Sequence, residues 1–210
     1  MPSKAARPAK QQLWFPAGRY FLRTIKREDA SERWAEWLSD PWTVHVLNTA
    51  QRRMTKSDIA DYIKTFDQRE RLLLGIFERG GRAHVGFIRL DIDFEHSEAL
   101  VNAVIGEREH RNAGATVNTF IPLLKFVFDS LKLKRVRASV LERNQTTRRY
   151  LLKLGWQLDP EPESPVHSHS DGALLARRGM SWTRDGFQTC LNSALGRRIM
   201  QSMEATGVER

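Results

Sequence analysis

The feature that most constrains this chain is a change of hydrophobic period between residues 99 and 131. The segment ALVNAVIG (99–106) is apolar on both faces, as central strands of a sheet are. After a basic turn, apolar residues recur at helical spacing as Val117, Phe120, Ile121, Leu124, Val127, Phe128 and Leu131. A buried strand that passes through a short turn into an amphipathic helix indicates a sheet with a helix packed against it.

The other segments extend this pattern to a mixed α/β domain. Further strands are predicted at 20–25, 71–94 (a hairpin that turns at Gly80 and Gly81), 135–141 and 173–182. Further helices are predicted from about Glu28, from Thr55, over 145–155 and from Phe187. Long loops are predicted at 40–54 and 156–172. Because strands and helices do not alternate regularly, we expect an α+β arrangement around one sheet and not a doubly wound fold.

The length of 210 residues favours one domain with appendages. Residues 1–18 are basic and rich in small and polar residues, so we expect a disordered arm there. Residues 19–186 form the α/β domain. In 187–210 the helical pattern is Leu191, Leu195, Ile199 and Met203, which predicts an amphipathic helix packed on that domain.

Cysteine content and hydropathy indicate the compartment. The lone cysteine, Cys190, excludes an intramolecular disulfide and favours a reducing environment, so we expect a cytoplasmic protein. The sequence contains no run of about 18 apolar residues, and no membrane span or membrane partner is predicted.

The chain is strongly basic, with a formal net charge of +9 and a pI near 10.1. Such a charge favours polyanionic partners, among them nucleic acids, anionic lipids and phosphorylated small molecules. The excess is concentrated between Lys132 and Lys153, where many basic residues stand against one acid, Glu142. A solvated face is the alternative explanation for such a run.

The turn between the central strand and its helix reads REHRNAGATVN (108–118). The first N–H groups of a helix lack intrahelical partners, and the helix dipole adds positive charge there. A phosphate group can therefore bind at such a turn. Gly114 would let the backbone approach a ligand closely, and Arg108 and Arg111 would add charge. A plain structural turn is the alternative.

The segment 102–156 resembles the acetyl-CoA-binding core of the GNAT superfamily of N-acetyltransferases. In that family a strand leads into Gln/Arg-x-x-Gly-x-Gly/Ala at a helix start, and the matching residues here are Arg111, Asn112, Ala113, Gly114, Ala115 and Thr116. Thr116 departs from the family's glycine or alanine. The stretch NQTTRRYLLKLGW (144–156) is similar to the family's asparagine, helix and Lys-Leu-Gly-Phe-like ending. The chain looks closest to the branch with ribosomal-protein-alanine and amino-sugar acetyltransferases.

The resemblance implies a single GNAT-like domain with a central, mostly antiparallel sheet, splayed middle strands and helices on both faces. It also implies acetyl-CoA as the cosubstrate. The pantetheine arm would pair with the strand that ends at Ile105 and Gly106, and the diphosphate would lie on the amides of 111–116. Asn144 would bind the cofactor near the thioester and can also cap its helix. No metal is implied, and His167 and His169 have no third ligand at suitable spacing.

Acetyl transfer to an amine needs a base for the amine, a donor for the oxyanion and an acid for the departing thiolate. The family's usual acid is a tyrosine at the position of Leu151. Tyr150 lies one residue earlier and is our candidate acid. Asp93 is our candidate base, with Asp91 and Glu107 as alternatives, and each of these carboxylates can also be simply solvated.

Two functions remain open from the sequence. The first is an acetyl-CoA-dependent N-acyltransferase that transfers acetyl directly to a primary amine of a small molecule, an amino sugar or a protein N-terminus. The second is a catalytically inactive GNAT-fold module with a regulatory role or with nucleic acid as its partner, which the basic charge and the shifted tyrosine favour. We favour the enzyme, as a monomer or a homodimer, with both long loops shaping its acceptor pocket.

Overall fold

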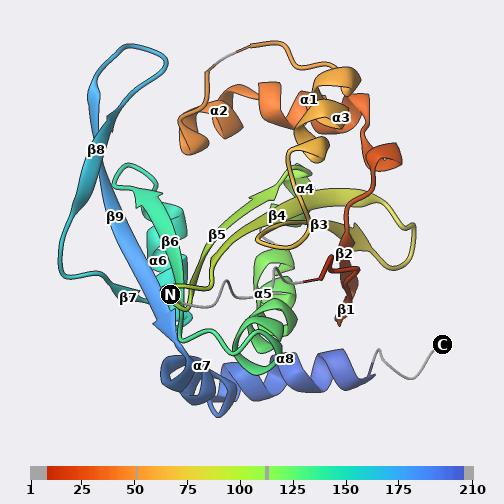
Figure 1. Cartoon of the computed structure of the whole chain (residues 1–210), viewed down its shortest axis with the longest axis vertical. Helices are drawn as coiled ribbons and strands as arrows, with labels where there is room; N and C mark the ends of the chain where they lie inside the picture. The colour runs from red at the N-terminus through yellow and green to blue at the C-terminus, as the bar shows by residue number, and fades with distance from the viewer. Residues whose placement is uncertain (1–8, 51, 112–113, 206–210) are drawn as a thin grey trace, which may run out of the picture.

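The computed structural model describes residues 9–50, 52–111 and 114–205, which form one sheet with helices on both faces (Figure 1). Within these residues the strand order is β1-β2-β3-β4-β5-β6-β9-β7, with β8 also paired to β9. The strands are β1 (Trp14–Ala17), β2 (Tyr20–Thr24), β3 (Arg71–Glu78), β4 (His84–Asp93), β5 (Glu98–Ile105), β6 (Arg135–Leu141), β7 (Gln157–Leu158), β8 (Glu163–His167) and β9 (Leu174–Thr183). Only the β5–β6 pair is parallel among these strands, so the predicted mostly antiparallel sheet is confirmed.

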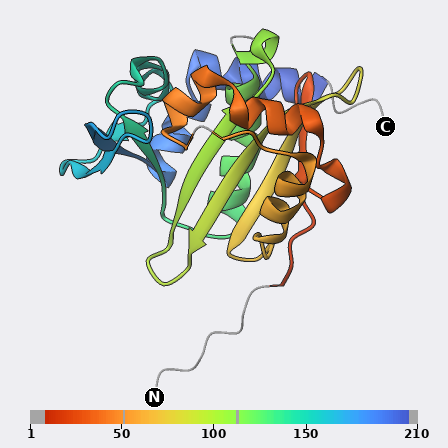
Figure 2. The same cartoon turned by 90° about the horizontal axis from the view of Figure 1, so that it is seen from above.

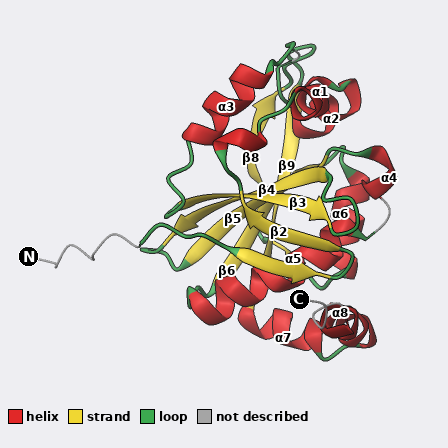
Figure 3. Ribbon diagram, turned by 90° about the vertical axis from the view of Figure 1, so that its right-hand side faces the viewer, coloured by secondary structure: helices red, strands yellow, loops and turns green. Residues whose placement is uncertain are grey.

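Different helices cover the two faces of the sheet (Figures 2 and 3). The helices are η1 (Arg27–Asp29), α1 (Glu32–Ser39), α2 (Pro41–Leu47), α3 (Lys56–Lys64), α4 (Arg108–Arg111), α5 (Ala115–Lys125), η2 (Phe126–Ser130), α6 (Gln145–Lys153), α7 (Arg184–Leu191) and α8 (Ala194–Ala205). Helices α5, α6 and α7 bury their apolar sides in the larger core, while α1 and α3 bury theirs in a second, aromatic core on the opposite face. Helix α8 packs against α5.

The middle strands β5 and β6 start as neighbours and then separate. They are paired only where residues 98–100 face 135–137, although β5 continues to Ile105 and β6 to Leu141. Each strand stays paired with its outer partner, β5 with β4 and β6 with β9, so the two halves of the twisted sheet diverge. The gap opens upward in Figure 1, toward α2. The predicted splay of the middle strands is therefore confirmed.

Several boundaries differ from the sequence expectations. Within the arm predicted over 1–18, residues 14–17 form β1, an edge strand that adds to β2 because Phe15 and its neighbours pack on the larger core. Residues 1–8 of that arm lie outside the described part of the chain. The predicted closing helix over 187–210 is two helices, since α7 ends at Leu191 and the Ser193 hydroxyl accepts from the Gly196 N–H to start α8.

The two predicted loops also contain regular structure. Residues 40–54 include α2, which Asp40 caps by accepting from the Thr43 N–H at 3.1 Å, with Pro41 at the first helical position. Residues 156–172 include β7 and β8, which pair with β9. Both segments were taken for loops because their short elements carry prolines and little hydrophobic periodicity.

Candidate active site

The turn after β5 leads through α4 to the first residue of α5. Gly114 precedes α5 with φ +78°, a left-handed conformation that favours glycine. Among the described residues other than its chain neighbours, a Cβ added there would meet only the Asn118 side chain, at 3.8 Å. The Asn118 N–H donates to Gly114 O at 3.0 Å, and the amides of 115–117 precede this first helical bond. Asn112 and Ala113 lie outside the described residues.

One edge of β5 faces the gap between the middle strands. The Gly106 N–H donates to Val85 O at 2.9 Å, toward β4. Since backbone direction alternates along a strand, the N–H and C=O groups of Ala103 and Ile105 point the other way, into the gap. The Val101 C=O points there too, while its N–H belongs to the last paired position with Arg137. Beyond residue 100 this edge has no paired strand in the described part of the chain. It is therefore suited to pairing with an extended ligand.

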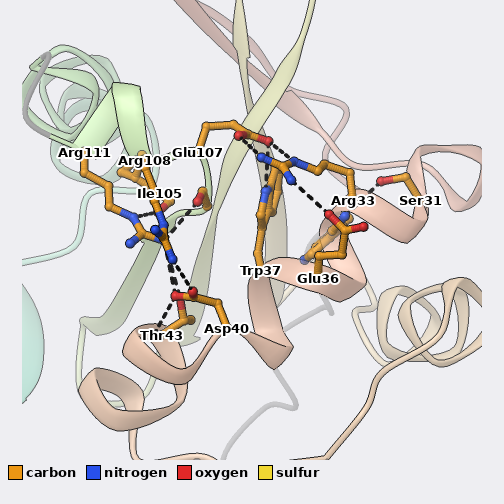
Figure 4. A network of polar contacts seen from close by, with 12 residues as sticks. Ser31, Arg33, Glu36, Trp37, Asp40, Thr43, Ile105, Glu107, Arg108 and Arg111 are labelled. Carbon is orange, nitrogen blue, oxygen red and sulfur yellow. Dashed lines mark hydrogen bonds and ion pairs between the residues drawn. The ribbon is translucent and has the colours of Figure 1, made fainter.

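The Arg111 side chain turns back onto the end of β5 (Figure 4). Its Nε donates to Ile105 O at 3.1 Å and its Nη2 to Gly106 O at 3.0 Å. Its guanidinium also lies 4.2 Å from the centre of the Trp42 ring and 3.7 Å from the Asp40 carboxylate. The side chain is 17% exposed, and burial lowers the pKa of Arg111 despite the acid. These contacts place the guanidinium between the end of β5 and the first turn of α2.

Gly106 and Glu107 fasten the same turn to α1. A Cβ on Gly106 would lie 2.0 Å from the Trp37 ring, so glycine is needed for this indole to pack directly on the backbone. The Glu107 carboxylate accepts from Arg33 Nε at 2.6 Å and from Trp37 Nε1 at 3.0 Å (Figure 4). The hydrogen bonds from Arg33 lead the causes that hold the pKa of Glu107 low. Glu107, which the sequence offers as an alternative base, is therefore engaged in hydrogen bonds that hold the turn to α1.

Tyr150 and Asn144 lie on the next strand–helix connection. The Tyr150 hydroxyl is buried and faces the backbone N–H of Val117 in the first turn of α5, yet no described group completes a regular hydrogen bond with it. Burial raises the pKa of Tyr150 well above its usual value, and the Val117 N–H offsets this only in part. Asn144 caps α6 by accepting from the Thr147 N–H at 3.2 Å. Leu151, the usual tyrosine position, is buried in the core.

A pocket of about 520 Å³ opens where β5 and β6 part. Carboxylates and arginines dominate its lining, which consists of Asp91, Ile92, Asp93, Glu98, Leu100, Arg137, Ser139, Glu163, Ser164 and Arg177. Leu100 belongs to the residues whose side chains face the sheet surface opposite α5, because Ala99 and Val101 are in the α5 core. The pocket therefore meets the start of the gap from the side away from α5.

The predicted base, Asp93, lies at the rim of this pocket. Its carboxylate bonds His96 Nδ1 at 2.7 Å and accepts from the His96 N–H at 2.9 Å, which closes the β4–β5 turn. These two bonds lower the pKa of Asp93. The alternative base, Asp91, lies 2.7 Å from Arg89 and 3.3 Å from Arg71. Both aspartates are on the pocket side of the sheet, while Tyr150 and Asn144 are beyond the end of β6.

Sequence similarity decides the family. A family model for the acetyltransferase (GNAT) domain matches residues 19–157. This chain belongs to the GNAT acetyltransferase family. It is therefore an acyltransferase that uses acetyl-CoA, and the predicted family and enzyme class are confirmed. A search of curated proteins finds no match.

Solved structures share the fold of this GNAT acetyltransferase. Ribosomal-protein-S5-alanine acetyltransferase from Vibrio fischeri aligns with a TM-score of 0.70 and 16% identity, over 82% of this chain and 97% of that one. Spermidine N-acetyltransferase from Vibrio cholerae, in complex with CoA and spermine, aligns with a TM-score of 0.69 and 14% identity, over 81% of this chain and 98% of that one. A nucleotide-linked sugar GNAT in its apo form aligns at 0.67 with 16% identity, over 86% and 96%. At these identities the similarity shows the fold alone.

The remaining histidine and cysteine candidates of this GNAT chain make structural contacts. The described residues contain no group of three or more His, Cys, Asp or Glu side chains arranged to hold a metal ion. His167 Nδ1 lies 3.1 Å from Gly172 O, within the loop between β8 and β9. Cys190 is buried on α7, and burial raises the pKa of its thiol. Among the described helices, none has the length and apolar character to cross a membrane.

Of the residues that line the pocket, sequence reasoning offered only Asp91 and Asp93 as site residues, and it also missed Asp40 near the turn. Ser139 follows Arg137 on the same face of a predicted strand, so the two-residue period could have identified it. Glu163 accepts a hydrogen bond from Ser139, but it lies in a segment that was read as a loop and offered no signal. Asp40 reaches Arg108 across 68 residues of sequence, at 2.9 Å, which no local pattern indicates.

Proposed function

We propose that this enzyme transfers an acetyl group from acetyl-CoA directly to a primary amine that enters the pocket beside Asp93. The observation that carries the proposal is that the unpaired edge of β5 lies between the Gly114 turn at one end and that pocket at the other. From Ile105 back to Leu100 the strand spans roughly 17 Å at about 3.3 Å per residue. This length is comparable to an extended pantetheine arm, so the thioester would reach the pocket.

The residues from this turn to the pocket suit the parts of acetyl-CoA. The amides of 115–117 and the positive end of the α5 dipole suit the diphosphate. The open-edge groups of Ala103 and Ile105, with the Val101 C=O, suit the amides of the pantetheine arm, and the Asn144 side-chain NH2 group remains available, since its cap uses only the oxygen. Arg111 adds a positive charge at the corner where diphosphate and arm meet.

Tyr150 is the proposed acid for the departing thiolate. A phenol without a regular hydrogen-bond partner in the described protein can donate its proton, and this role requires the sulfur to lie on the α6 side of the gap, near the first turn of α5. Its raised pKa keeps the hydroxyl protonated at neutral pH, which is the form that an acid requires. The backbone N–H groups on the open edge of β5 are the proposed donors to the oxyanion.

Asp93 is proposed to receive the acceptor's ammonium group at the pocket rim. Its low pKa keeps the carboxylate ionised, so it can hold a cationic amine and pass the amine's proton through water. Asp91 and Glu98 place further carboxylates on the same wall. Arg137 and Arg177 on the opposite wall can contact an anionic part of the acceptor.

The cofactor site is tested by a pair of glycine variants. Gly114→Ala and Gly172→Ala both place a Cβ on a left-handed residue, at φ +78° and +71°, with no described atom beyond the chain neighbours closer than 3.8 Å to the added atom. Each should lose about 1 kcal/mol of stability. Only Gly114→Ala should also bind CoA roughly tenfold more weakly, because its methyl group stands where the diphosphate approaches. Isothermal titration calorimetry measures both affinities, and equal affinities would refute the proposed site.

The acceptor is tested by a panel built from three chemical classes of amine. Spermidine, a peptide with an N-terminal alanine and a nucleotide-linked amino sugar represent the proteins that share this fold. We expect acetyl-CoA-dependent acetylation of one class, with loss of activity in Asp93→Asn. An Asp171→Asn variant, changed at an exposed carboxylate of the β8–β9 loop, is the control. Thioester hydrolysis alone, with every amine rejected, would contradict transfer to a primary amine.

A further inference from the structure

Helix α2 lies across the open end of the gap between β5 and β6 (Figure 1). Its last turn is attached to segments beyond β6. Arg143, next to the proposed cofactor residue Asn144, donates to His45 O. Asn48 donates to His167 O at 2.9 Å and accepts from the His169 N–H at 3.1 Å, which joins α2 to the loop after β8. The same β8 strand lines the acceptor pocket, so α2 spans both sides of the site.

The first turn of α2 is attached to the cofactor turn by two arginines. Arg108 Nη2 donates to Asp40 Oδ1 at 2.9 Å, and Arg111 Nη2 lies 3.5 Å from Thr43 Oγ1 (Figure 4). The Arg111 guanidinium also lies over the Trp42 ring. Burial favours a neutral Asp40, but the bonds from Arg108 and Thr43 outweigh it and lower the pKa. The first turn of α2 is thus held by charges that belong to the cofactor site.

Arg111 has two competing sets of partners in this arrangement. Its present partners are two neutral carbonyl oxygens, the Thr43 hydroxyl at 3.5 Å, one aromatic ring and a carboxylate at 3.7 Å, which is a loose ion pair. A diphosphate beside Gly114 would offer a guanidinium two charged oxygens in a bidentate geometry, which is a stronger interaction. Ile105 O, one of the present acceptors, also belongs to the open edge that the pantetheine arm needs.

We propose that Arg111 is a positioning residue that links cofactor binding to the placement of α2. The inference rests on the proposed acetyl-CoA site. In the arrangement that the structure describes, Arg111 holds the first turn of α2 through Trp42 and Asp40. When acetyl-CoA binds, the guanidinium turns toward the diphosphate, Ile105 O becomes available to the arm, and Trp42 loses its cation. The first turn of α2 is then no longer fixed to the end of β5 by Arg111.

The first test uses Trp42 as a reporter of this change. Free CoA is titrated into the full-length enzyme while tryptophan emission and, separately, the heat of binding are recorded. We expect a CoA-dependent emission change that Trp42→Phe removes and Trp14→Phe retains. Trp14 is the matched control because it is exposed to a similar degree, 56% against 51%, and lies on β1, stacked on Phe21.

The outcomes separate the two proposals. If CoA gives no heat with the wild-type enzyme, the cofactor site and the coupling both fail. If CoA binds but Trp42→Phe keeps the full emission change, the coupling alone fails and the cofactor site stands.

A second variant tests the direction of the effect. Asp40→Asn keeps an equally good helix cap but removes the charge that holds Arg108 and Arg111. If the free enzyme must release these arginines to bind CoA, the variant should bind CoA about two- to fivefold more tightly. If Asp40 only stabilised the turn, Asp40→Asn would bind CoA more weakly than the wild type. Unchanged or weaker CoA binding in Asp40→Asn would therefore overturn the proposal.

Discussion

Tyr150 shows how one residue step in a helix decides between core and site. The hydrophobic period places Leu151 against the sheet, where it is 4% exposed. Its neighbour Tyr150 is turned by about 100°, and this rotation directs the hydroxyl to the first turn of α5. A buried hydroxyl without a partner destabilises a fold, so its presence next to a substrate path favours a chemical role.

We predict that Tyr150→Phe lowers kcat by roughly 100-fold. The affinity for CoA should change little, because the ring and its packing are kept. Folding stability should be equal or slightly higher, since an unpartnered buried hydroxyl is removed. Steady-state kinetics, calorimetry and thermal unfolding measure the three quantities. Tyr62→Phe, on α3, is the control and should leave kcat unchanged.

Strand β5 combines two roles on its two edges. Toward β4 its residues pair in a regular antiparallel ladder over residues 98–105. Toward β6 the ladder ends after residue 100, which leaves the Val101 C=O and the groups of Ala103 and Ile105 on the gap side. Unpaired edges are usually covered or shortened in proteins, so an inner edge kept open for several residues indicates a binding function.

We predict that Ala103→Pro weakens CoA binding about fivefold while the enzyme still folds. Proline removes an N–H that points into the gap and leaves the ladder with β4 intact. The loss corresponds to about one hydrogen bond of 0.5–1.5 kcal/mol. Asn102→Pro is the contrasting variant, because that N–H points to β4 and its loss should lower the thermal stability instead. Equal effects of both variants on stability and affinity would contradict the assigned edge directions.

At the scale of the molecule, the second core joins α1 and α3 to the sheet around a buried histidine. His84 is surrounded by rings, with centroids at 4.7 Å to Phe77, 4.9 Å to Trp34 and 5.0 Å to Trp37. Both of its ring nitrogens lack hydrogen-bond partners among the described residues. Burial lowers the pKa of His84 to about 4, so it stays neutral in the folded protein.

We predict that this histidine makes the fold sensitive to mild acid. Between the unfolded pKa of about 6.5 and the folded pKa of about 4, only the unfolded chain takes up the proton. Stability should therefore fall across that window, by about 3 kcal/mol from this group. His84→Phe keeps the stacked ring, and urea unfolding at pH 7 and pH 4.5 should show a smaller loss than in the wild type.

The control for the acid effect is His96, whose pKa is shifted in the opposite direction to that of His84. The hydrogen bond that the His96 ring donates to the Asp93 carboxylate raises the pKa of His96, so its stabilising contribution is present at low pH and lost as the pH rises through the folded pKa. His96→Gln should not reduce the acid sensitivity. A His84→Phe variant that loses as much stability as the wild type would show that other groups cause the acid response.

Much of the fold was accessible from the sequence because its signals are local. The apolar period of 117–131, the helix that begins at Thr55 and the Asn144 cap all appear as expected, since each depends on residues within a few positions. Short elements at irregular spacing, such as α2 and β8, were missed because few residues carry their pattern.

The sequence by itself determined the family, the α+β class and the place of the glycine turn, because motif spacing and hydrophobic period are properties of neighbouring residues. Only the tertiary structure decided which groups Arg111 contacts, where the middle strands part and which side chains line the pocket. Asp40 and Arg108 meet across 68 residues, and the gap exists because β5 and β6 each follow a different outer strand. Such contacts depend on how the chain brings distant segments together, which no local pattern encodes.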